Sequence, residues 1–430
     1  MIARSPSPPA VRALLSPDAQ AAPRKQKTMS AKPTKTVIFT YQQLSNIGCE
    51  IIIRGSIAFM RNAFPQFRLK FVLCSYHADR DRQLLSDIAD VEIVPMVWWK
   101  RYVRGVLVKS GLEKRFWTPR FAEKHFDKAD LLMSVGGDIY SMASGDLPND
   151  WLGWERYATR KGIPSIMFGA NMDKIEGLPA SKQAELIEHL NRFRVILVRD
   201  AANLEYLAGF GVKDNVDFYP DPIFTLRPET EIARDQIRKI GVNLTPIVRR
   251  EYGDPAFERM AKIIDLLVAE GYTVKLIPHV YDTDNSPALD DRIALDHLYS
   301  FISPSSRDKV EPHSGPMSLA EISPKIADVD LFIGARMHSC LNAMTLGKPT
   351  YFLSYSTKAR TMVDWLQAGP MRDTPERIAC GASDAIDSET VLSFIKQNQP
   401  SQDLPKHRPS FVNQEMRDEM VNQMQGLGIL

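Results

Sequence analysis

Short apolar runs rich in β-branched residues alternate along this chain with longer stretches of helical periodicity, starting near residue 36. In the first half, the apolar runs predict strands at 36–40, 69–74, 91–97, 131–135, 165–169 and 195–198. The stretches between them predict helices at 51–63, 119–126, 154–161, 181–192 and 201–209. Alternation of this kind is typical of βαβ units that build a mainly parallel sheet.

The alternation breaks around Tyr219-Pro220-Asp221-Pro222, and a second series of the same kind follows. Its predicted strands are 240–244, 273–277, 331–333 and 350–353, and its predicted helices are 257–270, 289–302, 319–328, 339–346 and 361–368. We therefore predict an α/β protein with two Rossmann-like parallel-sheet domains, residues 36–225 and 226–385, that face each other across a cleft. This is a GT-B-like architecture. Residues 386–430 predict a helical extension, in which a Pro-rich loop at 399–409 separates two helices.

Composition and charge narrow the class of protein. Hydrophobic residues make up 44% of the chain and charged residues 25%, as in ordinary globular proteins. The net charge of +2 gives no support for a nucleic-acid or membrane partner. Residues 1–36 hold seven Lys or Arg and one Asp, so we expect residues 1–35 to form a disordered basic segment. No apolar run approaches the roughly 18 residues of a transmembrane helix, so no transmembrane segment is expected.

The four cysteines are scattered, without a CxxC pair or the spacing of metal ligands. This pattern is typical of reduced cysteines in a cytosolic protein. It predicts no metal site.

The most informative stretch follows the predicted strand 331–333. The strand ends at Gly334, and a tight turn leads to a helix that carries Arg336 and His338 at its start. Lys358 opens the helix after the next strand. The carboxyl ends of neighbouring parallel strands meet at one sheet edge, where α/β sheets bind ligands. Because a helix N-terminus already carries partial positive charge, basic groups there indicate an anionic ligand. Arginine suits carboxylate or phosphate, and histidine suits proton transfer near neutral pH.

Two further strands of the second domain end in polar residues, Asn243 and His279. We expect both at the same sheet edge as Arg336, and therefore as candidates for substrate binding. A lone histidine is more often structural than catalytic, and that interpretation of His279 stays open at this point.

In the first domain, Gly136-Gly137-Asp138 comes directly after a buried strand. The two glycines would let the backbone approach a ligand closely. Asp138 could accept a proton from a hydroxyl group, or it could cap the loop. Arg199 ends another strand and precedes Asp200, which is most simply a helix N-cap. Arg199 is a candidate for binding an anion, with a salt bridge inside this pair as the alternative.

Asn46-Ile47-Gly48-Cys49-Glu50 follows the first strand. A glycine turn that leads into a helix is common in such folds, so the motif is weak alone. Asn46 could cap the helix, and Glu50 would lie in its first turn, where the dipole favours a carboxylate.

Together these motifs resemble the polysaccharide pyruvyl transferase family, over roughly residues 36–370. The matching segments occur in the family's order: Asn46 to Glu50, Gly136 to Asp138, Val198 to Asp200, Asp221-Pro222, Gly241 to Leu244, Pro278-His279, and Gly334 through Gly347-Lys348-Pro349 to Lys358. Two positions depart from the pattern. Cys49 stands where many members have Asp, which moves any acidic role there to Glu50, and Asp138 replaces a third glycine.

The resemblance implies a transferase that moves the enolpyruvyl group of phosphoenolpyruvate onto a saccharide, forming a pyruvate ketal and releasing phosphate, without a cofactor or metal. It implies that Arg336, Lys358 and Arg199 hold the two anions of phosphoenolpyruvate. His338 would be the acid that protonates its methylene carbon, with Arg336 and Asp138 as the other catalytic residues. The acceptor would contact the first domain near Asn46, Asp138, Tyr140 and Asn171. The other expected substrate-binding residues are Gly48, Glu50, Gly136, Gly137, Asn243 and His279.

Such an enzyme would act in exopolysaccharide or cell-surface glycan synthesis. It would be cytoplasmic, peripheral to the inner membrane where its acceptor is lipid-linked. Two other functions fit the same pattern. One is a GT-B glycosyltransferase that uses a nucleotide sugar. The other is a non-catalytic module that binds an anionic saccharide, although simple binding has little need for a titratable histidine.

Overall fold

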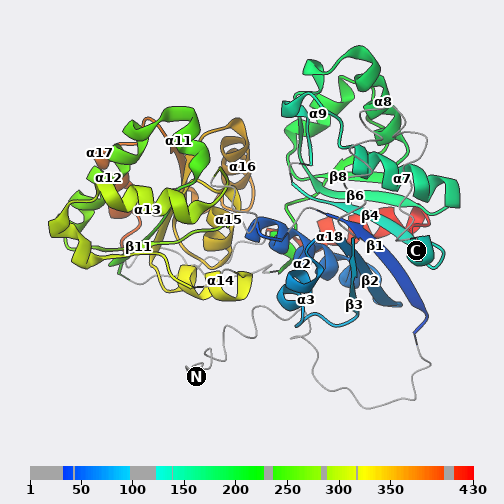
Figure 1. Cartoon of the computed structure of the whole chain (residues 1–430), viewed down its shortest axis with the longest axis horizontal. Helices are drawn as coiled ribbons and strands as arrows, with labels where there is room; N and C mark the ends of the chain where they lie inside the picture. Colours follow the sequence, from blue (N-terminus) through cyan, green and yellow to red (C-terminus); the bar gives the residue numbers. More distant parts are fainter. Residues whose placement is uncertain are drawn as a thin grey trace. The chain divides into compact units, whose positions relative to one another are not determined.

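The computed structural model describes residues 32–41, 44–96, 123–137, 139–226, 236–281, 288–315, 318–400 and 411–430. These residues form two compact units (Figure 1). The first unit contains the described residues up to Leu44, those of 52–226 and those of 412–430. The second contains Ser45–Ile51 and the described residues of 227–411. The predicted disordered segment, apart from residues 32–35, lies outside the described residues.

The first unit is built on a parallel sheet, with seven strands within its described residues in the order β3-β2-β1-β4-β6-β8-β9. The strands are β1 (Thr34–Thr40), β2 (Arg68–Ser75), β3 (Val91–Pro95), β4 (Leu131–Val135), β6 (Ser165–Ala170), β8 (Val195–Val198) and β9 (Val216–Phe218). Every residue of β4, β6 and β8 is buried. Strands covered on both faces need such continuous apolar runs. Two short strands, β5 (Tyr140–Ser141) and β7 (Met172–Asp173), pair beside the main sheet.

Helices cover both faces of this sheet. Trp154 and Tyr157 of α7 (Asn149–Lys161) pack in a cluster with Ile38 of β1. On the opposite face, Phe59 of α2 (Ile47–Ala63) stacks on Phe168 of β6, with ring centroids 4.6 Å apart. The other helices of the unit are α3 (Ala78–Leu84), α6 (Glu123–Phe126), α8 (Ala180–Asn191), α9 (Ala202–Ala208), α10 (Ile223–Leu226) and α18 (Gln414–Gly426).

The second unit contains another parallel sheet, with six strands within its described residues in the order β12-β11-β10-β13-β14-β15. The strands are β10 (Lys239–Asn243), β11 (Thr273–Leu276), β12 (Val310–Glu311), β13 (Leu331–Gly334), β14 (Thr350–Ser354) and β15 (Ile378–Ala382). Its helices are α11 (Pro246–Tyr252), α12 (Asp254–Ala269), α13 (Asp291–Phe301), α14 (Leu319–Ala327), α15 (Met337–Thr345), α16 (Thr357–Ala368) and α17 (Ser388–Gln397).

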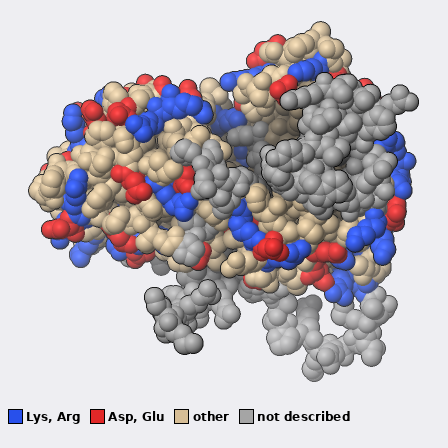
Figure 2. All heavy atoms as spheres, in the orientation of Figure 1, with Lys and Arg blue, Asp and Glu red and all other residues tan. Residues whose placement is uncertain are grey.

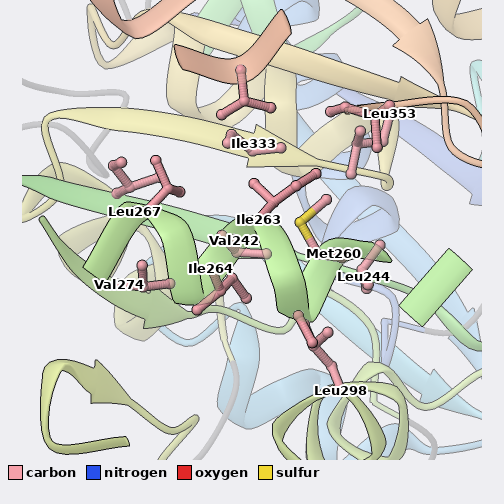
Figure 3. Packing of buried hydrophobic residues seen from close by; sticks show 14 of the residues in the cluster. Val242, Leu244, Met260, Ile263, Ile264, Leu267, Val274, Leu298, Ile333 and Leu353 are labelled. Atoms are coloured by element: carbon pink, nitrogen blue, oxygen red, sulfur yellow. The ribbon is translucent and has the colours of Figure 1, made fainter. Parts of the chain in front are cut away.

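The core of the second unit lies between α12 and the sheet (Figure 3). Ile264 and Leu267 of α12 meet Val242 of β10 and Ile333 of β13, and all four are fully buried. Alternate residues of a strand point to opposite faces. Asn243 therefore points away from this core, toward the other side of the sheet edge.

The strand order creates a switch point between β10 and β13. From β10 the chain continues to β11 and β12 on one side, and it then returns to β13 on the other side. Asn243 at the end of β10 is in register with Gly334 at the end of β13. Open α/β sheets bind ligands at such points, beyond the carboxyl ends of the strands.

Within the described residues, the predicted strands and helices are confirmed, with ends that shift by a few residues. The pattern did not reveal α3, β5, β7, β9, α10, α11, β12 or β15. The two predicted C-terminal helices form, but α17 packs into the core of the second unit and α18 belongs to the first. No helix within the described residues is both long and apolar enough to cross a membrane. On the face shown in Figure 2, basic and acidic side chains are interspersed over the described surface.

Candidate active site

Arg336 lies at the N-cap of α15, directly after β13. Its Nε donates a hydrogen bond to Oδ1 of Asp291 at 3.0 Å, and its Nη2 lies 2.9 Å from the same oxygen. Nη2 also donates to the carbonyl oxygen of Leu289 at 2.8 Å. Burial opposes the charged form of Arg336, but Asp291 and the phenol of Tyr355 outweigh it and raise the pKa of the guanidinium. Arg336 is therefore held as a cation with its counter-ion inside the protein.

Asp291 is fully buried at the first position of α13, and it is the residue that the sequence pattern did not single out. Its Oδ2 accepts hydrogen bonds from the backbone N–H groups of His279 and Val280, each at 3.0 Å. It also accepts one from Nδ2 of Asn243 at 3.2 Å. One carboxylate thus connects the ends of β10, β11 and β13.

Asn243 is fully buried, and its amide is engaged by the protein. Nδ2 donates to Ile277 and Asp291, while Oδ1 accepts from the backbone N–H of Arg336 at 3.0 Å and from Ser339 at 3.3 Å. These contacts fix the turn between β13 and α15. The predicted contact of Asn243 with a substrate stays a prediction.

His279 is buried beneath this edge, with 1% of its surface exposed. Among the described residues, no donor or acceptor lies within hydrogen-bonding distance of its Nε2. Burial, followed by the charges of His338 and Arg336, holds the pKa of His279 well below its ordinary value. The ring is therefore neutral near pH 7. A buried polar atom without a partner is costly, and such atoms commonly mark a place for a ligand or water.

His338 is the second residue of α15, and its imidazole lies against Gly48. A Cβ atom added at Gly48 would be 2.8 Å from Nδ1 of His338 and 3.0 Å from Cγ. Both distances are shorter than ordinary van der Waals contact. Glycine is therefore the residue that lets the Asn46 to Glu50 motif approach this ring.

The Ser45–Ile51 segment packs entirely within the second unit. The backbone N–H of Ile47 donates to the carbonyl of His279 at 3.2 Å, and Asn46 forms a bridge with Val280. Oδ1 of Asn46 accepts from the N–H of Gly48 at 2.9 Å, so Asn46 caps the start of α2. This agrees with its interpretation as a cap. The segment therefore supports His279 and His338 directly.

Glu50 is fully buried, and its Oε2 accepts a hydrogen bond from the N–H of Leu319, the first residue of α14, at 2.9 Å. A carboxylate at a helix N-terminus is favoured by the helix dipole. This geometry gives Glu50 a structural partner. It does not support the predicted contact with a substrate.

Lys358 is the second residue of α16, which follows β14. It therefore lies at the start of the helix after this strand, as predicted. Tyr355, three residues earlier, carries the phenol that hydrogen-bonds Arg336 and helps to raise its pKa. The predicted basic residues of the second domain thus follow adjacent strands, β13 and β14, of one sheet edge.

The remaining predicted site residues belong to the first unit. Arg199 is 4% exposed, and its Nη1 donates to Oδ2 of Asp221 at 2.7 Å. Its Nη2 lies 2.7 Å from the position of a Cβ on Gly137, whose carbonyl accepts from the N–H of Asn171. Oδ1 of Asp200 accepts a hydrogen bond from the backbone N–H of Ala202 at 3.0 Å, but the N-cap of α9 is Ala201, so the prediction of Asp200 as the N-cap is wrong by one residue. Arg199 therefore forms a buried ion pair with Asp221.

Gly136 and Gly137 follow β4, as predicted, and Asp138, the predicted proton acceptor, lies outside the described residues. The predicted contact of Tyr140 with an acceptor stays a prediction. Tyr140 is 1% exposed, and its hydroxyl lies 3.0 Å from Nε2 of His189, whose Nδ1 lies 3.2 Å from Glu155. Burial raises the pKa of Tyr140. Its hydroxyl serves this internal network, which does not support contact with an acceptor.

Residues 46–357 match the sequence model of a family described as Polysaccharide pyruvyl transferase. The match spans well over half of the 430 residues. The chain belongs to the polysaccharide pyruvyl transferase family. It is therefore a transferase. A search of the curated proteins found no match.

Solved structures similar to this pyruvyl transferase family member include two UDP-GlcNAc 2-epimerases. The protein from Methanocaldococcus jannaschii is 8% identical, with a TM-score of 0.54, over 92% of this chain and 99% of that chain. The protein from Neisseria meningitidis, bound to UDP-GlcNAc, is 12% identical, with a TM-score of 0.52, over 92% of this chain and 100% of that chain. At such identities the likeness shows the fold alone, which is GT-B-like.

The family match includes every residue of the cluster around Arg336, from Asn46 to His338, and it ends one residue before Lys358. In this pyruvyl transferase family member, Arg336, His338 and His279 are brought together within one unit. Within the described residues, no group of three or more His, Cys, Asp or Glu side chains could hold a metal ion.

Proposed function

We propose that the protein transfers the enolpyruvyl group of phosphoenolpyruvate to a saccharide, closes it to a pyruvate ketal and releases phosphate. The observation that carries this proposal is the grouping of Arg336, His338 and His279 at a sheet-edge switch point, where Nε2 of His279 has no partner among the described residues. Membership of the pyruvyl transferase family gives the reaction class.

The donor has two anionic groups, and the cluster offers two kinds of contact for them. Arg336 is a fixed cation that can bind carboxylate or phosphate. The neutral His279 can donate a hydrogen bond from Nε2 without adding charge. Lys358, in the first turn of α16, is the further cation that we assign to donor binding.

His338 is our candidate for the acid. Protonation of the methylene carbon of phosphoenolpyruvate develops positive charge at C2, and a sugar hydroxyl adds there. The proton of that hydroxyl returns to His338. Phosphate then leaves with the C2–O electron pair, and a second hydroxyl of the sugar closes the ketal and gives its proton to the released phosphate. A well-placed general acid contributes on the order of 10²–10⁴-fold to the rate.

The acceptor is a saccharide, free or lipid-linked, in our proposal, and the enzyme acts in the cytoplasm in glycan synthesis. Gly136, Gly137 and Asn171, at the carboxyl edge of the first sheet, remain the predicted acceptor contacts, together with Asp138. Arg199 is paired with Asp221 there, so we assign it to the architecture of this edge.

The test is phosphate release from phosphoenolpyruvate with a panel of saccharide acceptors. We expect His338→Ala to lower kcat on the order of 100-fold or more. Arg336→Lys keeps a cation beside Asp291 but loses the planar fork, so we expect a higher KM for phosphoenolpyruvate. His313→Ala is the matched control, because His313 pairs with Asp296 on the surface.

A wild-type protein that releases no phosphate with any acceptor, yet binds a nucleotide sugar tightly, would refute the proposal in favour of glycosyl transfer. Full activity of His338→Ala would refute the assignment of the acid alone.

A further inference from the structure

Asp291 is surrounded by donors. Its Oδ1 faces Nε and Nη2 of Arg336 at 3.0 and 2.9 Å. Its Oδ2 accepts from the backbone N–H groups of His279 and Val280 and from Nδ2 of Asn243, at 3.0, 3.0 and 3.2 Å. The side chain is fully buried. Oδ1 thus binds the guanidinium of Arg336, and Oδ2 binds the backbone at His279 and Val280.

The position of Asp291 at the start of α13 makes this carboxylate a fixed charge. Asp290 is the N-cap and Asp291 the first helical residue, where the partial positive charge of the helix end favours an anion. The charge and the position of Asp291 are therefore set by the protein, before any donor molecule binds.

We propose that Asp291 is a positioning residue that holds Arg336 and His279 at a fixed separation and orientation for the donor. Asp291 itself touches no substrate, because the protein surrounds both of its oxygens. The Nε and Nη2 groups of Arg336 face Asp291 and Leu289, and Tyr355 also hydrogen-bonds the guanidinium, so the donor anion meets the part of the guanidinium that these partners leave. The kinetic consequence of this role rests on the proposed function. Its structural consequence can be measured without any donor.

An amide cannot replace this carboxylate, although it has the same size. Asparagine has one acceptor oxygen and one NH₂ donor group. An asparagine side chain at this position would therefore turn its own N–H groups either toward Arg336 or toward the N–H groups of His279 and Val280. The guanidinium would also lose its buried counter-ion.

The experiment compares Asp291→Asn with Asp290→Asn in the full chain. Asp290 is the preceding residue, it pairs with Arg292, and asparagine also caps helices well. With phosphoenolpyruvate as the varied substrate, we expect Asp291→Asn to raise KM at least tenfold, with a smaller change in kcat. Asp290→Asn should stay within about twofold of wild type, since the ion pair that it loses is partly exposed. Asp291→Glu keeps the charge and should recover part of the loss.

A double-mutant cycle shows whether Asp291 acts through Arg336. In an Arg336→Ala background, Asp291→Asn should change kcat/KM by a smaller factor than in wild type, because only the positioning of His279 is then left to lose. An equal effect in both backgrounds, or equal KM values for Asp291→Asn and Asp290→Asn, would overturn the proposal.

The same cycle has a readout that needs no donor. Arg336→Ala leaves a buried carboxylate without its counter-ion, and adding Asp291→Asn removes that charge. We expect the double variant to have a higher Tm than Arg336→Ala alone. A lower Tm would overturn the pairing.

If wild type releases no phosphate from phosphoenolpyruvate, the proposed function fails, while this Tm comparison still decides whether Asp291 and Arg336 are coupled. If single variants do not fold, Asp291→Glu provides the kinetic comparison.

Discussion

At the scale of single residues, the imidazole of His338 explains why residue 48 is glycine. His338 occupies the space that a side chain at this position would need. The backbone of the Ser45–Ile51 segment can therefore lie directly against the imidazole, and this contact restricts the orientation of a ring that we assign to proton transfer.

Gly48→Ala should lower activity while the fold is retained. Its Cβ would come within 2.8 Å of Nδ1, so the imidazole must move. A displacement of about 1 Å in a reacting group can cost on the order of 100-fold in rate. The Tm should change little, because alanine is the better helix former in this first turn. Gly177→Ala is the control, since a Cβ there meets nothing within 4 Å. Unchanged phosphate release by Gly48→Ala would contradict the role given to His338.

Two buried histidines make stability depend on pH. Burial is the main cause that lowers the pKa of both His189 and His279 below the ordinary 6.5. As the pH falls below 6.5, the unfolded chain gains protons that the folded protein does not take up. Unfolding is therefore favoured as pH falls toward the folded pKa values. Urea unfolding followed at about pH 7.5 and about pH 5.5 should show a lower midpoint at the lower pH. His189→Gln should reduce this difference, and an unchanged midpoint would be inconsistent with two neutral rings.

The sequence placed Arg336, His338 and His279 after strands of one parallel sheet, but it did not indicate the counter-ion of Arg336. Arg336, His338 and His279 were found because each closely follows a strand of one parallel sheet. Asp291 follows Asp290 and has the pattern of an ordinary helix start, while its partner lies 45 positions away. Only the tertiary structure shows that pair. Since Arg336 has an internal counter-ion, its place at a helix start does not by itself require an external anion. His279 is stronger evidence for a ligand than Arg336, because Nε2 of His279 is buried and has no partner among the described residues.

At the scale of elements, α12 holds the second unit together. Its buried face, which includes Phe257, Met260 and Ile264, packs on the sheet that positions the site (Figure 3). Loss of contacts here should act on the whole unit, because the strands that end at Asn243 and Gly334 belong to this same core.

Ile264→Ala should lower the free energy of unfolding by about 2–5 kcal/mol, because Ile264 is fully buried and its removal leaves a cavity. Ile293→Ala is the matched control, since Ile293 on neighbouring α13 is 46% exposed. Urea unfolding followed by circular dichroism measures both. A loss for Ile293→Ala as large as that for Ile264→Ala would show that α12 is not the main packing element.

The elements that the sequence did not reveal share a cause. Strand β9 is three residues long and only partly buried, and α11 spans seven residues, so neither has a strong periodic signal. Strand β15 is largely half-buried at the end of its sheet. The predicted strands β8 and β13 have only four residues each, but all of them are buried, so their apolar runs are continuous. The predicted amphipathic helices repeat their pattern over several turns.

At the scale of the whole molecule, two parallel sheets carry two sets of polar residues. Counted within each unit, their described strands follow the same order, 3-2-1-4-5-6, and the first sheet adds a seventh strand. The set of the second unit includes Arg336, His338 and His279, while that of the first includes Arg199 and Asn171. The change between the units at Leu226 follows the Pro-rich break in the sequence pattern. The sequence pattern did not indicate that Ser45–Ile51 belongs to the second unit and Val412–Leu430 to the first.

This exchange of segments has a consequence for the evolution of the family. Because Ser45–Ile51 supports His279 and His338 from a distant part of the chain, a single recombination event at residues 226–227 would join one parent's segment to another parent's histidines. We expect chimaeras of two homologues made at that junction to lose activity unless residues 45–51 and 412–430 are exchanged with the unit to which they belong. Inheritance of the whole second unit therefore requires several crossovers, and its parts are expected to change together.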